Sequence, residues 1–272
     1  KIDTDYAFLN TWSDQMSSGI GFSFLNQREN LTNYNFSQIS ANYAYKVRIS
    51  DDWDFRPAVE VGFGFKSFGF QNLLLEDQIN IRSGINNSTS IDPALQNNKI
   101  GFFDVSAGMV FNKEDLWIGL SMKHLNRPNI AFNEGGNLPL NSFFSLSTGY
   151  EFLLADYIDV QLFPYETKMF ITSNYMQQGR YNRLDIGTSI LFEKMFFGAT
   201  AVTNPAKNGI DSHLLTSVNL FTGLQYDHLR FGFSYDLNTS KIGRTGGVYE
   251  LSMTYQFNLD KKCFGCPNYN GR

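Results

Sequence analysis

The chain has 272 residues and a formal net charge of −4, with 26 Phe and 14 Tyr but only two Cys. This weakly acidic balance argues against nucleic-acid binding, which usually needs a basic stripe on the protein surface. No run approaches the ~18 consecutive apolar residues of a transmembrane helix, and no long segment shows helical spacing. The start lacks the basic and apolar regions of a signal peptide, so we expect a processed or trimmed form.

Apolar and polar residues alternate with a period of two along most of the chain, which predicts extended strands with two unlike faces. Between Leu229 and Leu237, apolar or aromatic residues fill every second position, and Arg230 and Asp236 lie on the other face. Thirteen strands are predicted in chain order, at 1–11, 17–27, 34–49, 53–69, 101–111, 116–126, 142–153, 158–176, 181–193, 195–204, 212–226, 229–238 and 246–259.

The connections between these strands alternate in length. Tight turns are predicted at 50–52, 112–115, 154–157, 193–194 and 227–228. Longer connections are predicted at 28–33, 70–100, 127–141, 177–180, 205–211 and 239–245. Short turns on one side and longer loops on the other are typical of outer-membrane β-barrels. The alternative is a soluble β-sandwich or jelly roll, whose aromatic face would be buried in protein.

We therefore predict an all-β fold, an antiparallel transmembrane β-barrel with its apolar face toward lipid and its polar face toward the lumen. Only closure satisfies the backbone hydrogen bonds of every strand in hydrocarbon. Bacterial barrels usually have an even number of strands and the last should descend to the periplasm, so we expect about 14, with the first missing before Lys1. A miscount, or a strand from a partner chain, is the alternative. The barrel domain is expected over 1–260 and a periplasmic tail over 261–272.

Several stretches carry a family resemblance. They are GIGFSFLNQREN, ISANYAYKVRIS, FDVSAGMVFNKEDLWIGLSMKHLNRPN, FFSLSTGYEF and the closing LRFGFSYDLNTSKIG with GGVYELSMTYQF. Over about residues 17–259 the chain resembles the PorP/SprF family of outer-membrane proteins of Bacteroidota type IX secretion systems. The family's N-terminal segment, with an Asn-Pro-Ala-rich stretch and a first strand, is absent from this sequence.

The resemblance implies a non-enzymatic role in the outer membrane, in secretion or cell-surface anchoring of a cargo protein. In gliding members the cargo is a large adhesin recognised through its C-terminal domain. The implied partners are the lipid bilayer with its lipopolysaccharide, the cargo's C-terminal domain and periplasmic components of the secretion machine. A passive channel, or a transporter of hydrophobic compounds, is the second hypothesis.

Two connections are candidate partner-binding loops. The longest, 70–100, mixes polar residues with apolar ones, namely Leu73, Leu74, Leu75, Ile79 and Ile81. Loops of this length are often functional, so it is expected to plug the lumen or contact cargo, or else to be a surface loop with a short helix near 73–77. In 127–141, Ile130, Phe132 and Leu138 either dock a partner or pack on the barrel rim.

The polar faces of the strands carry charges of both signs. They are Lys46, Arg48, Arg56, Glu60, Lys66, Asp104, Lys123, Glu151, Arg183, Asp185, Arg230, Asp236 and Glu250. Unpaired buried charges are costly, so we expect these residues to pair or to stay hydrated. A selective pore would more often show one sign dominating a ring.

Cys263 and Cys266 form a C-x-x-C in the tail. Structural zinc normally takes four ligands, and a redox pair needs a thioredoxin-like context. A local disulfide in the oxidising periplasm or a contact with the secretion machine is therefore expected. His124, His213 and His228 have no Ser or Cys partner in a recognisable motif. We therefore predict no catalytic, metal or cofactor-binding residues.

Overall fold

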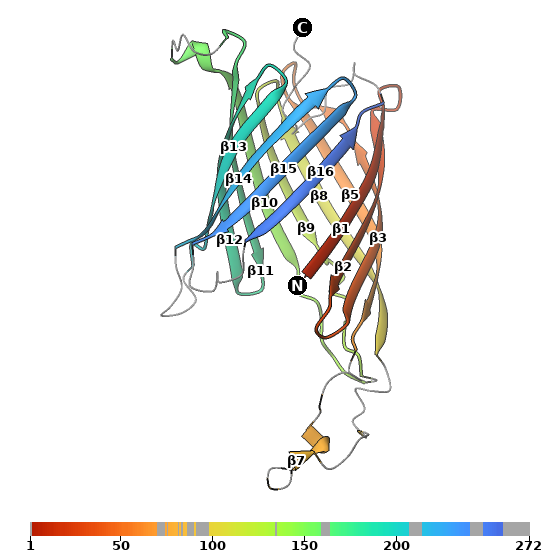
Figure 1. Ribbon diagram of the computed structural model, residues 1–272. Coiled ribbons are helices and arrows are strands. Elements are labelled where there is room, and N and C mark those ends of the chain that lie inside the picture. Colours follow the sequence, from red (N-terminus) through yellow and green to blue (C-terminus); the bar gives the residue numbers. More distant parts are fainter. Residues whose placement is uncertain are drawn as a thin grey trace. The chain divides into compact units, whose positions relative to one another are not determined.

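The fold was taken from a computed structural model, which describes residues 2–69, 74, 76–80, 82, 84–85, 90, 98–133, 135–158, 164–206, 214–239 and 247–257. An antiparallel sheet of 14 strands dominates these residues, so the predicted all-β class is confirmed (Figure 1). Two short 3-10 turns, Glu76–Gln78 and Leu154–Asp156, interrupt the connections. Within the described ranges no helix is long and apolar enough to cross a membrane.

The thirteen long strands correspond to the thirteen predicted ones and pair in chain order, with the short β4 beside β5. The fourteen strands of the sheet are β1 Ile2–Ser13, β2 Ser18–Glu29, β3 Tyr34–Tyr45, β4 Val47–Arg48, β5 Asp54–Ser67, β8 Lys99–Asn112, β9 Leu116–Lys123, β10 Phe143–Leu153, β11 Lys168–Gln178, β12 Tyr181–Phe192, β13 Met195–Thr203, β14 Leu215–Tyr226, β15 Leu229–Asn238 and β16 Val248–Tyr255. A separate hairpin pairs β6 Ile79–Asn80 with β7 Gly84–Ile85.

The chain divides into two compact units, which we describe in turn. Unit 1 is Lys1–Val47, Arg56–Gly108 and Met122–Ser142. Unit 2 is Arg48–Phe55, Met109–Ser121 and Phe143–Arg272. A single barrel domain over 1–260, its closure and a strand before Lys1 stay predictions.

In unit 1 the alternation of β5 becomes two faces with opposite exposure. The apolar side chains remain 44% to 56% exposed: Val59, Val61, Phe63 and Phe65. On the other face Gly62 and Gly64 are buried, and a Cβ on Gly64 would lie 2.5 Å from the ring of Phe102 on β8. The apolar face thus lacks protein cover, whereas a soluble sandwich would bury it. This is the arrangement expected of strands that face lipid.

Unit 2 fills its polar face with aromatic rings that lie over glycines. A Cβ on Gly149 would collide with the Trp117 ring, and one on Gly223 with the Phe196 ring. These glycines therefore leave room for aromatic rings that come from other strands. In the pairing of β13 with β14 the register shifts between Val202 and Thr203.

The prediction for 158–176 was wrong at its start. After β10 the chain forms the 3-10 turn Leu154–Asp156, and β11 begins only at Lys168. Pro164 cannot donate a ladder hydrogen bond, and the Thr167 N–H donates to its carbonyl at 3.0 Å. The 154–167 connection is therefore longer than predicted. Conversely, β11 and β12 are joined by the two residues 179–180, so the alternation of turn lengths fails there.

Candidate functional site

Three connections of unit 1 are joined at the same end of its strands. The Gly69 N–H donates to the Thr32 carbonyl at 2.9 Å, and the Phe68 N–H donates to the Asn98 carbonyl at 3.0 Å. The turn between β2 and β3 is thus bonded to the start of the β5–β8 connection, and the two ends of that connection are bonded to each other. We call residues 30–34, 68–69, 98 and 127–141 together the loop platform.

Aromatic contacts add the 127–141 loop to this platform. The Phe68 ring lies 6.3 Å from the ring of Tyr34 and 6.4 Å from that of Phe132, measured between centroids. Such edge and tilted contacts stabilise beyond simple burial. Phe132 therefore packs on the neighbouring strand ends, which was one of the two alternatives for this loop.

The 127–141 loop is internally hydrogen-bonded around Asn129. The Asn129 side chain donates to the Gly136 carbonyl at 2.7 Å and accepts from the Ala131 and Leu138 N–H groups at 3.1 and 2.8 Å. The Ile130 N–H also donates to the Leu138 carbonyl at 2.9 Å. These bonds give the loop a defined conformation, because its polar backbone groups are satisfied locally.

Some predicted partner-binding residues are exposed and others are not. Leu138 is 56% exposed, Leu74 58% and Ile79 49%, whereas Ile130 and Phe132 are half-buried. Leu73, Leu75, Ile81, His213, Cys263 and Cys266 lie outside the described residues. The exposed leucines of the platform are therefore the side chains available to a partner.

Sequence reasoning missed Leu31, which is 83% exposed in the turn between β2 and β3. The Glu29 carboxylate holds this turn, because it accepts from the Leu31 N–H at 2.6 Å and from the Thr32 N–H at 2.9 Å. The only signal in the sequence is one apolar residue inside the polar run NLTN. A prediction based on the longest apolar loops passes over it.

A polar cluster lies at the base of the 127–141 loop. The Asp104 carboxylate contacts Nδ1 of His124 at 2.9 Å and accepts from the Gln38 amide at 3.3 Å, and its side chain is only 2% exposed. Lys123 and Glu60 lie 3.8 Å apart beside it. We call Gln38, Glu60, Asp104, Lys123 and His124 the polar cluster.

The polar cluster marks the point where β9 ends and the loop begins. His124 has a φ of 59°, which turns the chain out of the strand direction. The Asn126 side chain then bonds β8, accepting from the Val105 N–H at 3.1 Å and donating to the Phe103 carbonyl at 2.7 Å. The cluster therefore sets the direction in which the platform loop leaves the sheet.

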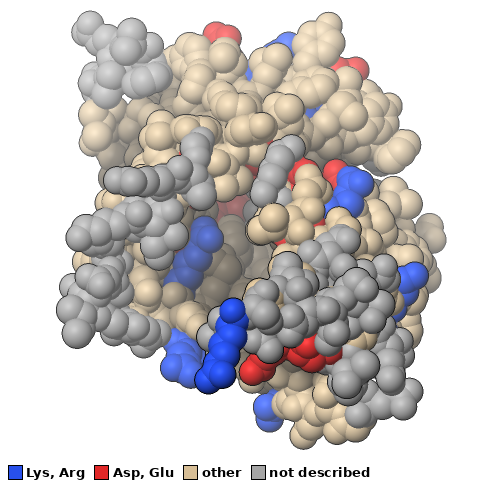
Figure 2. Space-filling model, turned by 60° about the horizontal axis from the view of Figure 1, so that its bottom comes forward, with Lys and Arg blue, Asp and Glu red and all other residues tan. Residues whose placement is uncertain are grey.

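Charges on the polar faces also pair elsewhere. Glu151 binds Lys168 at 2.5 Å and Asp185 binds Arg183 at 2.7 Å, both in unit 2. Charges of both signs also appear in the view of Figure 2. Nδ1 of His228 lies 2.6 Å from the Gln256 carbonyl oxygen. Among the described residues no group of three metal-ligating side chains occurs.

Comparisons with known proteins identify the family of this chain. The family model described as type IX secretion system membrane protein PorP/SprF matches residues 2–255. Among solved structures, the chain is similar to a double mutant of Rh. blastica porin, with 7% identity, a TM-score of 0.38, and coverage of 93% of this chain and 89% of that one. No curated protein matches. The chain therefore belongs to the PorP/SprF family and is an outer-membrane protein of the type IX secretion system.

Proposed function

We propose that this protein binds the C-terminal domain of a secreted cargo protein on its loop platform, and so anchors the cargo at the cell surface or assists its export. The observation that carries the proposal is a hydrogen-bonded platform that exposes Leu31 and Leu138. Membership of a type IX secretion family supports it. The mechanism is binding, and no chemical step is assigned to the chain.

The orientation of the platform supports an extracellular partner. It lies at the strand ends joined by the 68–98 and 124–142 connections, whereas β1 and β2 are joined at the other end by the short turn 14–17. Long loops of outer-membrane β-proteins face outward and short turns face the periplasm. The predicted periplasmic tail 261–272, with Cys263 and Cys266, lies outside the described residues, and its contact with the secretion machinery stays a proposal.

The exposed leucines favour a protein partner. Burying one leucine side chain gains about 1.5–3 kcal/mol, and Leu31 is 83% exposed. Because hydrogen bonds already hold both turns, little conformational entropy is lost on binding. A protein surface with apolar pockets is the occupant that such fixed leucines fit.

The test is affinity purification from native outer membranes, with mass spectrometry of the retained proteins. The wild-type chain should retain a large secreted protein through its C-terminal domain. The double variant Leu31→Glu with Leu138→Glu should lose it, because a carboxylate cannot be buried in an apolar pocket without a partner. Met16→Glu is the matched control, since Met16 is 66% exposed in the turn at the opposite end of β2.

Two outcomes contradict the proposal. In the first, the double variant retains as much cargo as the Met16→Glu control. In the second, the wild-type protein purifies alone and conducts ions in a planar bilayer. The second outcome supports the passive channel instead.

A further inference from the structure

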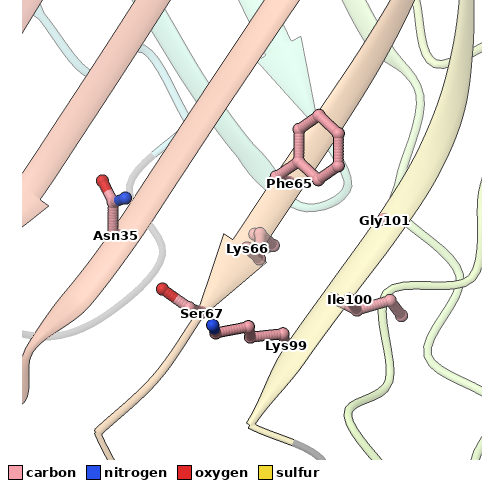
Figure 3. Close-up of a pocket in the computed structure, with 7 residues that line it drawn as sticks. All are labelled: Asn35, Phe65, Lys66, Ser67, Lys99, Ile100 and Gly101. Atoms are coloured by element: carbon pink, nitrogen blue, oxygen red, sulfur yellow. The ribbon is translucent and has the colours of Figure 1, made fainter.

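A pocket of about 380 Å³ opens where β3 begins, β5 ends and β8 begins, all within unit 1 (Figure 3). Asn35 is opposite Ser67, and Ser37 is opposite Phe65, in the antiparallel register of β3 and β5. Since side chains two residues apart share a face, Asn35, Ser67 and Phe65 lie on the exposed apolar face of the sheet. The pocket is therefore on the side of the strands that faces lipid.

The pocket has an apolar part and a polar part. Gly101 leaves space beside the aromatic rings of β5, because a Cβ there would lie 3.2 Å from the Phe63 ring and 3.7 Å from the Phe65 ring. Lys99 is two residues before Gly101, at the start of β8. The polar groups thus lie at the strand ends and the apolar surface extends along the strands.

The polar groups of the pocket are available to a ligand. Lys99 is exposed, and no carboxylate within the described part of the chain forms an ion pair with it. The Asn35 carboxamide also lines the pocket, and its NH2 group is the part that can donate to a phosphate, because its oxygen is a buried acceptor. The Lys99 ammonium, the Asn35 NH2 group and the Ser67 hydroxyl are therefore donors around the same space, a set that suits a phosphate. The second lining lysine, Lys66, holds its ammonium 5.9 Å from the centre of the Phe36 ring.

We propose that this pocket binds the phosphate of a lipid A headgroup in the outer leaflet, with Lys99, Asn35 and Ser67 on the phosphate. One acyl chain lies along Phe65 and Gly101. Lysine side chains at a membrane interface place their stems in the apolar region and the ammonium among the headgroups. The position beside the loop platform selects the outer leaflet, whose phosphorylated lipid is lipopolysaccharide. The proposal rests on the outward orientation of the platform and not on cargo binding.

The test measures lipid A retained by the purified full chain. Vesicles contain bisphosphorylated lipid A, its dephosphorylated form or phosphatidylglycerol, and bound lipid is counted by mass spectrometry. Lys99→Gln should weaken retention of the bisphosphorylated form about tenfold, the size expected when one charged hydrogen bond is lost. Gly101→Leu should weaken it too, by filling the apolar part. Lys194→Gln, at an exposed lysine in the turn between β12 and β13, should retain lipid like the wild type.

The proposal is overturned if Lys99→Gln retains as much bisphosphorylated lipid A as Lys194→Gln. It is also overturned if the dephosphorylated form binds equally well, since no phosphate is then recognised. Equal retention of phosphatidylglycerol contradicts the assignment to lipid A. Cargo capture by Lys99→Gln should equal that of the wild type, so this test and the cargo test fail separately.

Discussion

The polar faces of the two units differ in the side-chain contacts that fill them. Unit 1 places hydrogen-bonded polar side chains there, centred on Asp104 with His124 at 2.9 Å. Both units also seat rings over glycines, Phe102 over Gly64 in unit 1 and Phe196 over Gly223 in unit 2. Rings over glycine only fill space, whereas the polar cluster also fixes the start of the 127–141 loop. In unit 1 the polar face therefore also positions the loop platform.

The largest expected effect is the loss of a glycine from unit 2. Gly223→Ala should lower the free energy of unfolding by about 3 kcal/mol, because overpacking forces rings and backbone to shift. The added Cβ would meet the Phe196 ring and, at 2.5 Å, the Phe231 carbonyl oxygen. Unfolding in urea from detergent or lipid checks the value.

Gly119→Ala is the matched control for this prediction. Its nearest neighbour, the Trp117 ring, would lie 3.5 Å from the new Cβ, an ordinary contact. Equal stability of the two alanine variants would mean that the ring over Gly223 does not limit the packing of unit 2.

A smaller effect is expected in the polar cluster of unit 1. Asp104→Ala should cost about 2 kcal/mol of unfolding free energy, because Gln38 and His124 lose a buried acceptor. It should also increase hydrogen exchange at the Leu125 amide, which bonds the Val105 carbonyl at 2.8 Å next to the cluster. An unchanged exchange rate would mean that the cluster does not position the loop.

The smallest effect is expected for Lys123, which forms an ion pair with Glu60 in the polar cluster. Lys123→Ala should change the unfolding free energy by at most ~0.5 kcal/mol, as exposed ion pairs usually do. The Lys123 side chain is 50% exposed and lies 3.8 Å from Glu60. The measurement is the same urea titration. A loss as large as that of Asp104→Ala would show that the Lys123–Glu60 pair stabilises the cluster as much as Asp104 does.

Several features could be predicted from local sequence. The strands and their two faces follow from alternation, because the side-chain direction in a strand depends only on whether a position is odd or even. Alternation alone therefore assigns Val59, Val61 and Phe63 to one face, and their exposure in the structure agrees with it. The start of β11 was missed because the pattern of 158–176 continues through a turn at Pro164.

The loop platform and the pocket form only through contacts between segments that are distant in the sequence. Gln38 and Asp104 are 66 residues apart in the chain, yet they share a hydrogen bond. Phe68 meets Phe132, and Thr32 meets Gly69, only because strand pairing brings their loops to one end of unit 1. The sequence by itself determined which residues form strands and which face each residue joins, since both are local properties. Which loops touch, and hence that Leu31 is exposed beside them, depends on contacts between distant segments that no local pattern encodes.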